Sequence, residues 1–117
     1  MSRFWEYLYQ CSASKPSLNQ DQKSQNRKCL ETQKANQILN LLTNTKSEER
    51  IPSAVPAGIK VAHKTGTWSQ TGSWHDCGIV FAKNPTIICI MSENTTYEEA
   101  VKLIKKVTEA AVNSYSS

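Results

Sequence analysis

Four consecutive residues, Lys64-Thr65-Gly66-Thr67, combine a cation, two hydroxyls and a position without a side chain. The Lys64 ammonium can attract a carboxylate, and the two threonine hydroxyls can donate hydrogen bonds to the same group. Because Gly66 has no side chain, a flat substrate can lie against the backbone there. The pattern predicts one wall of a binding site for an anion. The alternative is an ordinary exposed strand lysine beside strand-forming threonines.

The chain has four cysteines and two histidines: Cys11, Cys29, Cys77, Cys89, His63 and His75. No cysteine pair forms C-x-x-C and the histidines are too far apart in sequence, which argues against a structural zinc site. Cys77 and Cys89 fall in apolar runs, where free thiols serve as small core residues. The sequence leaves a Cys11–Cys29 disulfide open. We expect no metal or other cofactor, and structural rather than catalytic histidines.

The composition is that of one globular domain. Apolar residues make up 38% and charged residues 21% of 117 positions. The mean hydropathy of −0.51 argues against a membrane-spanning segment, and the aromatic, charged start does not match a signal peptide. Residues 1–64 hold ten basic and five acidic side chains. These charges are scattered and lack interleaved aromatic residues, which argues against a nucleic-acid partner.

Apolar spacing predicts helices at residues 2–10 and 29–42, separated by a polar loop at 12–28. Strands are predicted at residues 59–67, 77–82 and 86–92, with odd-numbered and even-numbered residues of the first strand on opposite faces. The second and third strands are apolar almost throughout, which predicts burial on both faces. Short links favour antiparallel pairing, one of them through Gly72.

A long final helix completes the prediction. Thr95 and Thr96 each stand three residues before a glutamate, so a capping box is available in either register. An apolar stripe of about five turns follows. We therefore expect an α+β fold, in which a three-stranded antiparallel meander is packed by a long carboxy-terminal helix and preceded by two amino-terminal helices.

The predicted domain is incomplete. Residues 1–117 form a single partial domain, with a helical segment over 1–50 and the sheet plus final helix over 51–117. A sheet that is apolar on both faces needs two covering layers and a neighbour at each edge. Three strands and one strong helix do not supply these, so we expect the chain to oligomerise or to belong to something larger.

Several segments together carry a family resemblance: IPSAVPAGIKVAHKTGT, His75-Asp76 before the run CGIVFA, the run TIICIM and the final helix. They resemble the carboxy-terminal part of a class A serine β-lactamase. The likeness runs from about residue 30 to 115 and is strongest over 51–82. It implies a partial serine β-lactamase fold in which Lys-Thr-Gly lines the active site.

The resemblance implies roles for five residues. Lys64 and Thr67 would be catalytic, Thr67 through a backbone N–H that donates to the oxyanion, a contact worth about 3 kcal/mol of the barrier. Thr65, Gly66 and Thr67 would bind the substrate. Arg50 corresponds to an arginine that helps some family members to bind the substrate carboxylate. The alternative for Arg50 is a solvated loop residue.

The family reaction hydrolyses the β-lactam amide through an acyl-serine intermediate and confers antibiotic resistance. It needs a serine in S-x-x-K, an S-D-N element and a glutamate. Ser12-Ala13-Ser14-Lys15 matches S-x-x-K only formally, because Pro16 disfavours helix at Lys15. No S-D-N is present. We expect the half that bears the nucleophile to be absent and the chain alone to be inactive, so its standing as an enzyme stays open.

The implied partners are a β-lactam or peptidoglycan-like small molecule and the missing amino-terminal half. A fragment of a D-alanyl peptidase or transpeptidase is an alternative, because those enzymes share Lys-Thr-Gly. A non-catalytic binding remnant is another. Relatives of this kind are usually periplasmic or secreted, whereas this chain shows no export signal, so its location stays open.

Overall fold

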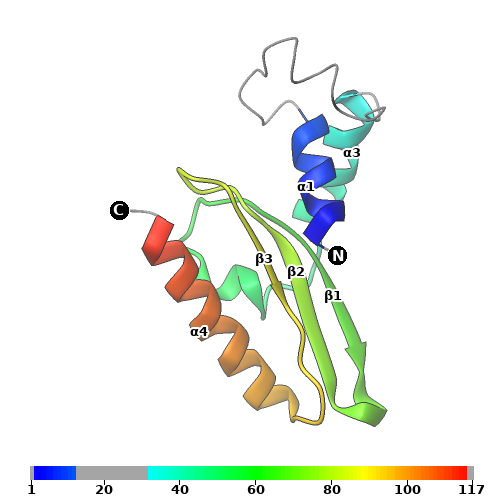
Figure 1. The fold of residues 1–117 in the computed structure, drawn as a ribbon, viewed down its shortest axis with the longest axis vertical. Coiled ribbons are helices and arrows are strands. Elements are labelled where there is room, and N and C mark those ends of the chain that lie inside the picture. Colours follow the sequence, from blue (N-terminus) through cyan, green and yellow to red (C-terminus); the bar gives the residue numbers. More distant parts are fainter. Residues whose placement is uncertain (1, 13–31, 116–117) are drawn as a thin grey trace.

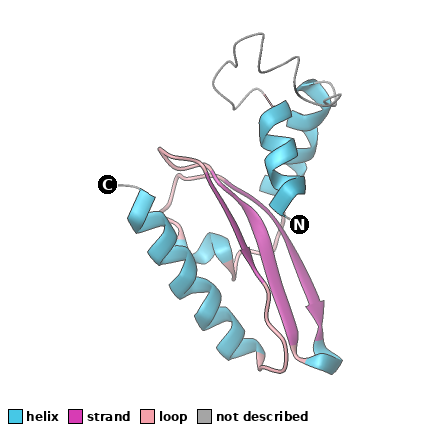
Figure 2. Ribbon diagram, viewed as in Figure 1, coloured by secondary structure: helices cyan, strands magenta, loops and turns pink. Residues whose placement is uncertain are grey.

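The computed structural model describes residues 2–12 and 32–115 (Figure 1). Its elements, in chain order, are α1 (Ser2–Cys11), α3 (Thr32–Thr43), the 3₁₀ turn η1 (Ile51–Ala54), β1 (Val61–Trp68), the 3₁₀ turn η2 (Ser69–Thr71), β2 (Ser73–Val80), β3 (Thr86–Ile90) and α4 (Tyr97–Tyr115). The strands form one antiparallel sheet in the order β1-β2-β3. The predicted α+β fold is confirmed (Figure 2). Almost all of the predicted loop 12–28 lies outside the described residues.

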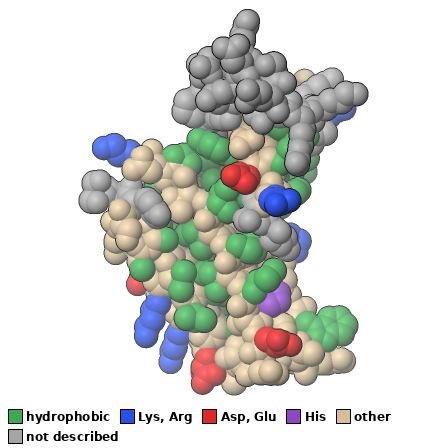
Figure 3. Space-filling model, viewed as in Figure 1, with side chains coloured by type: hydrophobic (Ala, Val, Ile, Leu, Met, Phe, Trp, Pro, Cys, Tyr) green, Lys and Arg blue, Asp and Glu red, His purple; other side chains and the backbone are tan. Residues whose placement is uncertain are grey.

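Helices cover both faces of the sheet. On one face, Val80 of β2 and Ile88 of β3 pack with Ile104 of α4. On the other face, Ile79 of β2 packs with Trp5 of α1 and with α3. Figure 1 shows α4 running along the sheet, whereas α1 and α3 stand together at one end of it. In the space-filling view, hydrophobic side chains gather over the middle of the visible face (Figure 3).

The start of α4 decides between the two predicted capping registers. The Glu99 N–H donates to Thr96 Oγ1 at 3.3 Å, and the Thr95 hydroxyl donates to the Glu99 carboxylate at 2.9 Å. Thr96 is therefore the capping residue and Glu99 occupies the third helical position. The helix buries Ala100, Ile104, Thr108 and Val112, which are spaced four apart. The apolar stripe expected from the sequence also includes Val107, but this side chain is 40% exposed, so the stripe is wrong at that position.

β2 begins four residues earlier than the sequence predicts. Its pairing with β1 continues to Trp68 opposite Ser73, at the hairpin. Gly72 makes this turn possible because its φ is +61°, and a Cβ there would lie 2.5 Å from the Thr95 carbonyl oxygen. The first residues of β2 can be polar because backbone hydrogen bonds to β1, rather than burial of apolar side chains, stabilise this end of the sheet.

Two expectations about β3 were wrong. Ile88 and Ile90 are buried under α4, but Cys89 is exposed on the opposite face because α1 and α3 cover only one end of that face. Cys77 and Cys89 are not free thiols. They stand opposite each other in the β2–β3 register, with Cα atoms 4.0 Å apart, and form a disulfide. The Cys11–Cys29 disulfide, which the sequence leaves open, involves a residue outside the described ranges, Cys29.

Removing the cross-strand disulfide should lower the stability of the sheet. The Cys77→Ala/Cys89→Ala variant opens a loop that spans 12 positions. Because the bond restricts the unfolded chain, we expect the free energy of unfolding to fall by about 2–3 kcal/mol. Urea unfolding of the wild type and the variant, followed by circular dichroism in buffers without added oxidant, checks this. An unchanged midpoint with an unchanged slope would show that the bond contributes nothing.

Candidate functional site

Residues 64–67 lie on β1, which is an edge strand of the described sheet. The even-numbered residues share the face on which Ala62 is buried with α1 and α3. The odd-numbered residues share the face on which Val61 is buried with α4. Residues 64–67 themselves are exposed or half-buried, so neither helical layer covers them fully. The predicted alternation of β1 is confirmed.

Lys64 is exposed, and its side chain bends along the strand. Its Nζ donates to the Thr65 carbonyl oxygen at 2.7 Å. An ammonium carries three donors, so this bond leaves others for a ligand. A positive charge therefore lies beside the backbone of an edge strand, with the hydroxyl of Thr65 on the next residue.

The Arg50 side chain reaches β1 from the residue that directly precedes η1. Its Nη1 donates to the Gly66 carbonyl oxygen at 3.0 Å and to the His75 carbonyl oxygen, and its Nη2 donates to Thr67 Oγ1 at 2.8 Å. These bonds join β1, β2 and the segment before η1. Because Thr67 Oγ1 accepts from Arg50, its own hydroxyl proton can be donated to a bound anion.

The alternative of a solvated Arg50 is wrong. The residue is only 7% exposed, and its guanidinium lies 5.9 Å from the centre of the Tyr97 ring, within the range of a cation–π contact. The Tyr97 hydroxyl donates to the Glu49 carboxylate beside it. Burial fixes the arginine charge under Thr67 rather than leaving it mobile in solvent.

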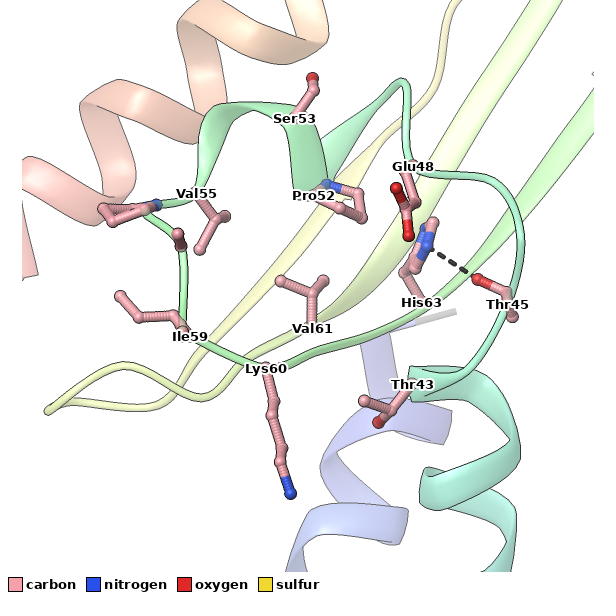
Figure 4. A pocket seen from close by; sticks show the side chains of 13 residues that line it. Thr43, Thr45, Glu48, Pro52, Ser53, Val55, Ile59, Lys60, Val61 and His63 are labelled. Atoms are coloured by element: carbon pink, nitrogen blue, oxygen red, sulfur yellow. Dashed lines mark hydrogen bonds between the residues drawn. The ribbon is translucent and has the colours of Figure 1, made fainter.

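A buried polar chain lies next to Arg50. His63 Nδ1 is 2.8 Å from Asp76 Oδ1, and Asp76 Oδ2 accepts from the Ile51 N–H at 3.0 Å. Thr45 Oγ1 lies 3.0 Å from His63 Nε2 (Figure 4). The side chains of His63 and Asp76 are 2% and 0% exposed. These hydrogen bonds therefore connect β1 and β2 to the backbone at the start of η1.

The two tryptophans at the hairpin differ in their surroundings. Trp74 packs edge-on against Tyr97, with ring centres 5.3 Å apart, and its Nε1 donates to the Thr95 carbonyl oxygen. Trp68 is 61% exposed and directly follows Thr67. Trp74 is thus a packing residue, whereas Trp68 offers an open aromatic surface at the end of segment 64–67.

Two cavities lie away from this segment. One of about 310 Å³ is lined by His63, Thr45 and the apolar side chains of Val55, Ile59 and Val61 (Figure 4). The other, of about 460 Å³, lies between β3 and α4. Neither is lined by residues 64–67. Residues 64–67 therefore form an open surface rather than the lining of either cavity.

The formal S-x-x-K motif gains no support from the described part of the chain. Ser12 directly follows α1 and is buried, and its hydroxyl donates to the Tyr9 carbonyl oxygen of that helix at 2.8 Å. Lys15 lies outside the described residues. Within residues 2–12 and 32–115, no group of His, Cys, Asp and Glu side chains could hold a metal ion. No helix in those ranges has the length and apolar character needed to cross a bilayer.

A sequence model of the β-lactamase enzyme family matches residues 22–115, most of the chain. The chain belongs to the β-lactamase enzyme family. The match includes β1 with residues 64–67 and the arginine beneath them. A comparison of the chain with curated proteins gives no significant match.

Solved structures show the fold that this β-lactamase family member shares. PBP-A superimposes with a TM-score of 0.67 at 20% identity, covering 75% of this chain and 34% of PBP-A. The β-lactamase of Sphaerobacter thermophilus gives 0.67 at 22% identity, covering 74% and 34%. A class A β-lactamase from Mycobacterium abscessus gives 0.65 at 22% identity, covering 77% and 36%. The chain spans about a third of the length of each.

Sequence reasoning missed how the residues under β1 are connected. The alternation of the first strand predicts the face that His63 occupies, but it does not pair His63 with Asp76. Their bonds to each other and to Ile51 depend on the β1–β2 register, in which Thr65 lies opposite Asp76. In this register, odd positions of β1 and even positions of β2 share a face. A histidine and an aspartate at such positions, each among apolar residues, is the signal that could have indicated the pair.

Proposed function

We propose that this chain forms the carboxylate-binding wall of a serine β-lactam hydrolase. Residues 64–67 are hereafter called the binding wall. One observation carries the proposal: the Lys64 ammonium and the Arg50 guanidinium both bond to groups of the binding wall, on an edge strand open to solvent. Two cations bonded to the same short strand segment favour an anionic ligand. Family membership supports a β-lactam as that ligand.

Each residue then has a defined task. Lys64 attracts the β-lactam carboxylate, and the Thr65 and Thr67 hydroxyls donate to it. Gly66 lets the bicyclic ring lie against the strand, because no side chain stands there. The Thr67 N–H stabilises the negative charge that develops on the β-lactam carbonyl oxygen. Arg50 holds the Thr67 hydroxyl oxygen and adds positive charge beneath it.

The nucleophile comes from outside the described residues in this proposal. A serine oxygen adds to the β-lactam carbonyl carbon, the C–N bond breaks, and water later releases the acyl group and regenerates the serine. Ser12 does not suit this task, since the residue is buried and its hydroxyl donates to the Tyr9 carbonyl oxygen of α1. The polypeptide that supplies the serine would pack on the part of the sheet that α1 and α3 leave open.

The 117-residue chain alone should therefore not hydrolyse a chromogenic cephalosporin above the buffer rate. Ser12→Ala should change nothing, because Ser12 is not the nucleophile. Absorbance assays with both proteins at high concentration check this expectation. Turnover that the purified chain shows and Ser12→Ala abolishes would contradict it.

Binding tests the proposal without turnover. We expect penicillin G to bind the full chain more tightly than its methyl ester does, because the ester has lost the carboxylate charge. Saturation-transfer NMR of each ligand, with competition by the other, compares the two. Equal affinities, or no binding of penicillin G, would refute the carboxylate-binding role.

A D-alanyl peptidase or transpeptidase is the second candidate. A variant of PBP-A, which has the same fold, is known as an acyl-enzyme complex with penicillin G. A peptidoglycan stem also ends in a carboxylate, so the same binding wall suits it. Competition between penicillin G and a D-alanyl-D-alanine peptide for the chain would distinguish the candidates, since only a peptidase wall should prefer the peptide.

A further inference from the structure

The buried carboxylate of Asp76 holds two donors from different parts of the chain. It lies 2.8 Å from His63 Nδ1 and accepts the Ile51 N–H at 3.0 Å. A carboxylate oxygen accepts hydrogen bonds, so the tautomer of His63 with a proton on Nδ1 matches this contact. The Thr45 hydroxyl meets the other ring nitrogen at 3.0 Å, which fixes the plane of the ring. With side-chain exposures of 0% and 2%, Asp76 and His63 lie beneath the exposed or half-buried residues 64–67 rather than among them.

The bond to Ile51 acts directly on Arg50. A planar peptide unit contains both the Ile51 N–H and the Cα of Arg50. Fixing that N–H therefore fixes the point from which the arginine side chain starts. From this point the guanidinium reaches Gly66 and Thr67 on β1, with bonds of 3.0 and 2.8 Å.

We propose that His63 and Asp76 are positioning residues, which place the Arg50 guanidinium under the binding wall and so set its affinity for a carboxylate. This inference rests on the proposed function. The pair would stabilise the sheet in any case, but a purely structural pair would not change the order of the Arg50 side chain or distinguish a charged ligand from a neutral one.

The decisive variant replaces both members of the pair, His63→Leu/Asp76→Leu. Exchanging a buried polar pair for apolar side chains is often compatible with folding, whereas removing one member leaves a buried group unpaired. The double variant loses the acceptor for Ile51. We expect the Arg50 side-chain N–H signals to lose their protection from exchange with water, and the Kd for penicillin G to rise about tenfold. Binding of the methyl ester should stay unchanged.

Three further proteins make the comparison specific. Asp76→Asn retains an oxygen for Ile51, and its amide can donate to the other tautomer of His63, so it should keep both Arg50 protection and affinity. Ile104→Val lowers stability in the core under α4 without touching the pair and should keep the affinity for penicillin G. On an Arg50→Ala background, the double leucine variant should cause no further loss of affinity.

The outcomes separate the two proposals. A folded double variant with protected Arg50 signals, or with lost affinity that persists on the Arg50→Ala background, would overturn the positioning role. Failure of the wild-type chain to bind penicillin G would refute the proposed function instead, and Arg50 protection would still decide the positioning role. Should the double variant not fold, loss of Arg50 protection in Asp76→Ala, against retention in Asp76→Asn, provides the same test.

Discussion

Replacing Lys64 with glutamine should weaken penicillin G binding on the order of tenfold to a hundredfold. Glutamine keeps most of the length of the side chain and a hydrogen-bond donor but removes the charge. Lys64 is exposed on an edge strand and bonds only within its own segment among the contacts described, through the Thr65 carbonyl oxygen. We therefore expect little change in stability. Ligand-observed NMR titrations of both proteins measure the difference.

Lys60 provides the matched control. It lies four residues before Lys64 in the approach to the same strand, is also exposed, and points away from the neighbouring Val61 in Figure 4. Lys60→Gln removes the same charge from the chain without touching the binding wall, and should change the affinity for penicillin G less than twofold, because exposed charges are screened by salt. Equal losses in both variants would mean that net charge, rather than Lys64, attracts the ligand.

Replacing Gly78 with alanine should destabilise the fold more than any other change of a single methyl group in the sheet. A Cβ on Gly78 would lie 2.3 Å from the Ala62 carbonyl oxygen and 2.6 Å from the His63 Cβ. Both belong to the neighbouring strand, which cannot move without breaking the β1–β2 ladder. We expect a loss of about 3 kcal/mol. For a domain of this size, such a loss lowers the melting temperature by about 10 °C or more.

Gly66→Ala is the control for that change. A Cβ at Gly66 would meet only His75 atoms, the nearest at 3.5 Å, which is ordinary van der Waals contact. Thermal unfolding should therefore leave Gly66→Ala within a few degrees of the wild type. The same variant should bind penicillin G more weakly, since the new methyl group stands where the ring lies on the strand. Comparable melting temperatures for the two alanine variants would contradict the packing argument.

The arrangement of the elements could be predicted because it depends on local patterns. Alternating residues predicted the two faces of β1, and the two threonine–glutamate pairs predicted a capped start of α4, although only the structure decides the register. The strand ends could not be predicted, because they depend on pairing: β2 begins at Ser73 only because Trp68 lies opposite it. The Cys77–Cys89 disulfide likewise requires the β2–β3 register, which two separate apolar runs do not reveal.

For the candidate site, the sequence indicated Lys64 to Thr67 through one short motif on a strand. Its identification of Arg50 rested on family resemblance, and it did not foresee that the residue would be buried. Burial arises from carbonyl oxygens on two strands and from Tyr97, which lies 47 positions away along the chain. Such contacts form only when the sheet and α4 assemble, so no local pattern encodes them.

Backbone amide shifts of the ¹⁵N-labelled chain during a penicillin G titration test the binding wall most directly. We predict the largest shifts at residues 64–67 and at the Arg50 side chain, and much smaller shifts with the methyl ester. Shifts concentrated at the 310 Å³ cavity near Val55 and Ile59, with residues 64–67 unchanged, would show that the ligand binds elsewhere and that these residues do not form the wall.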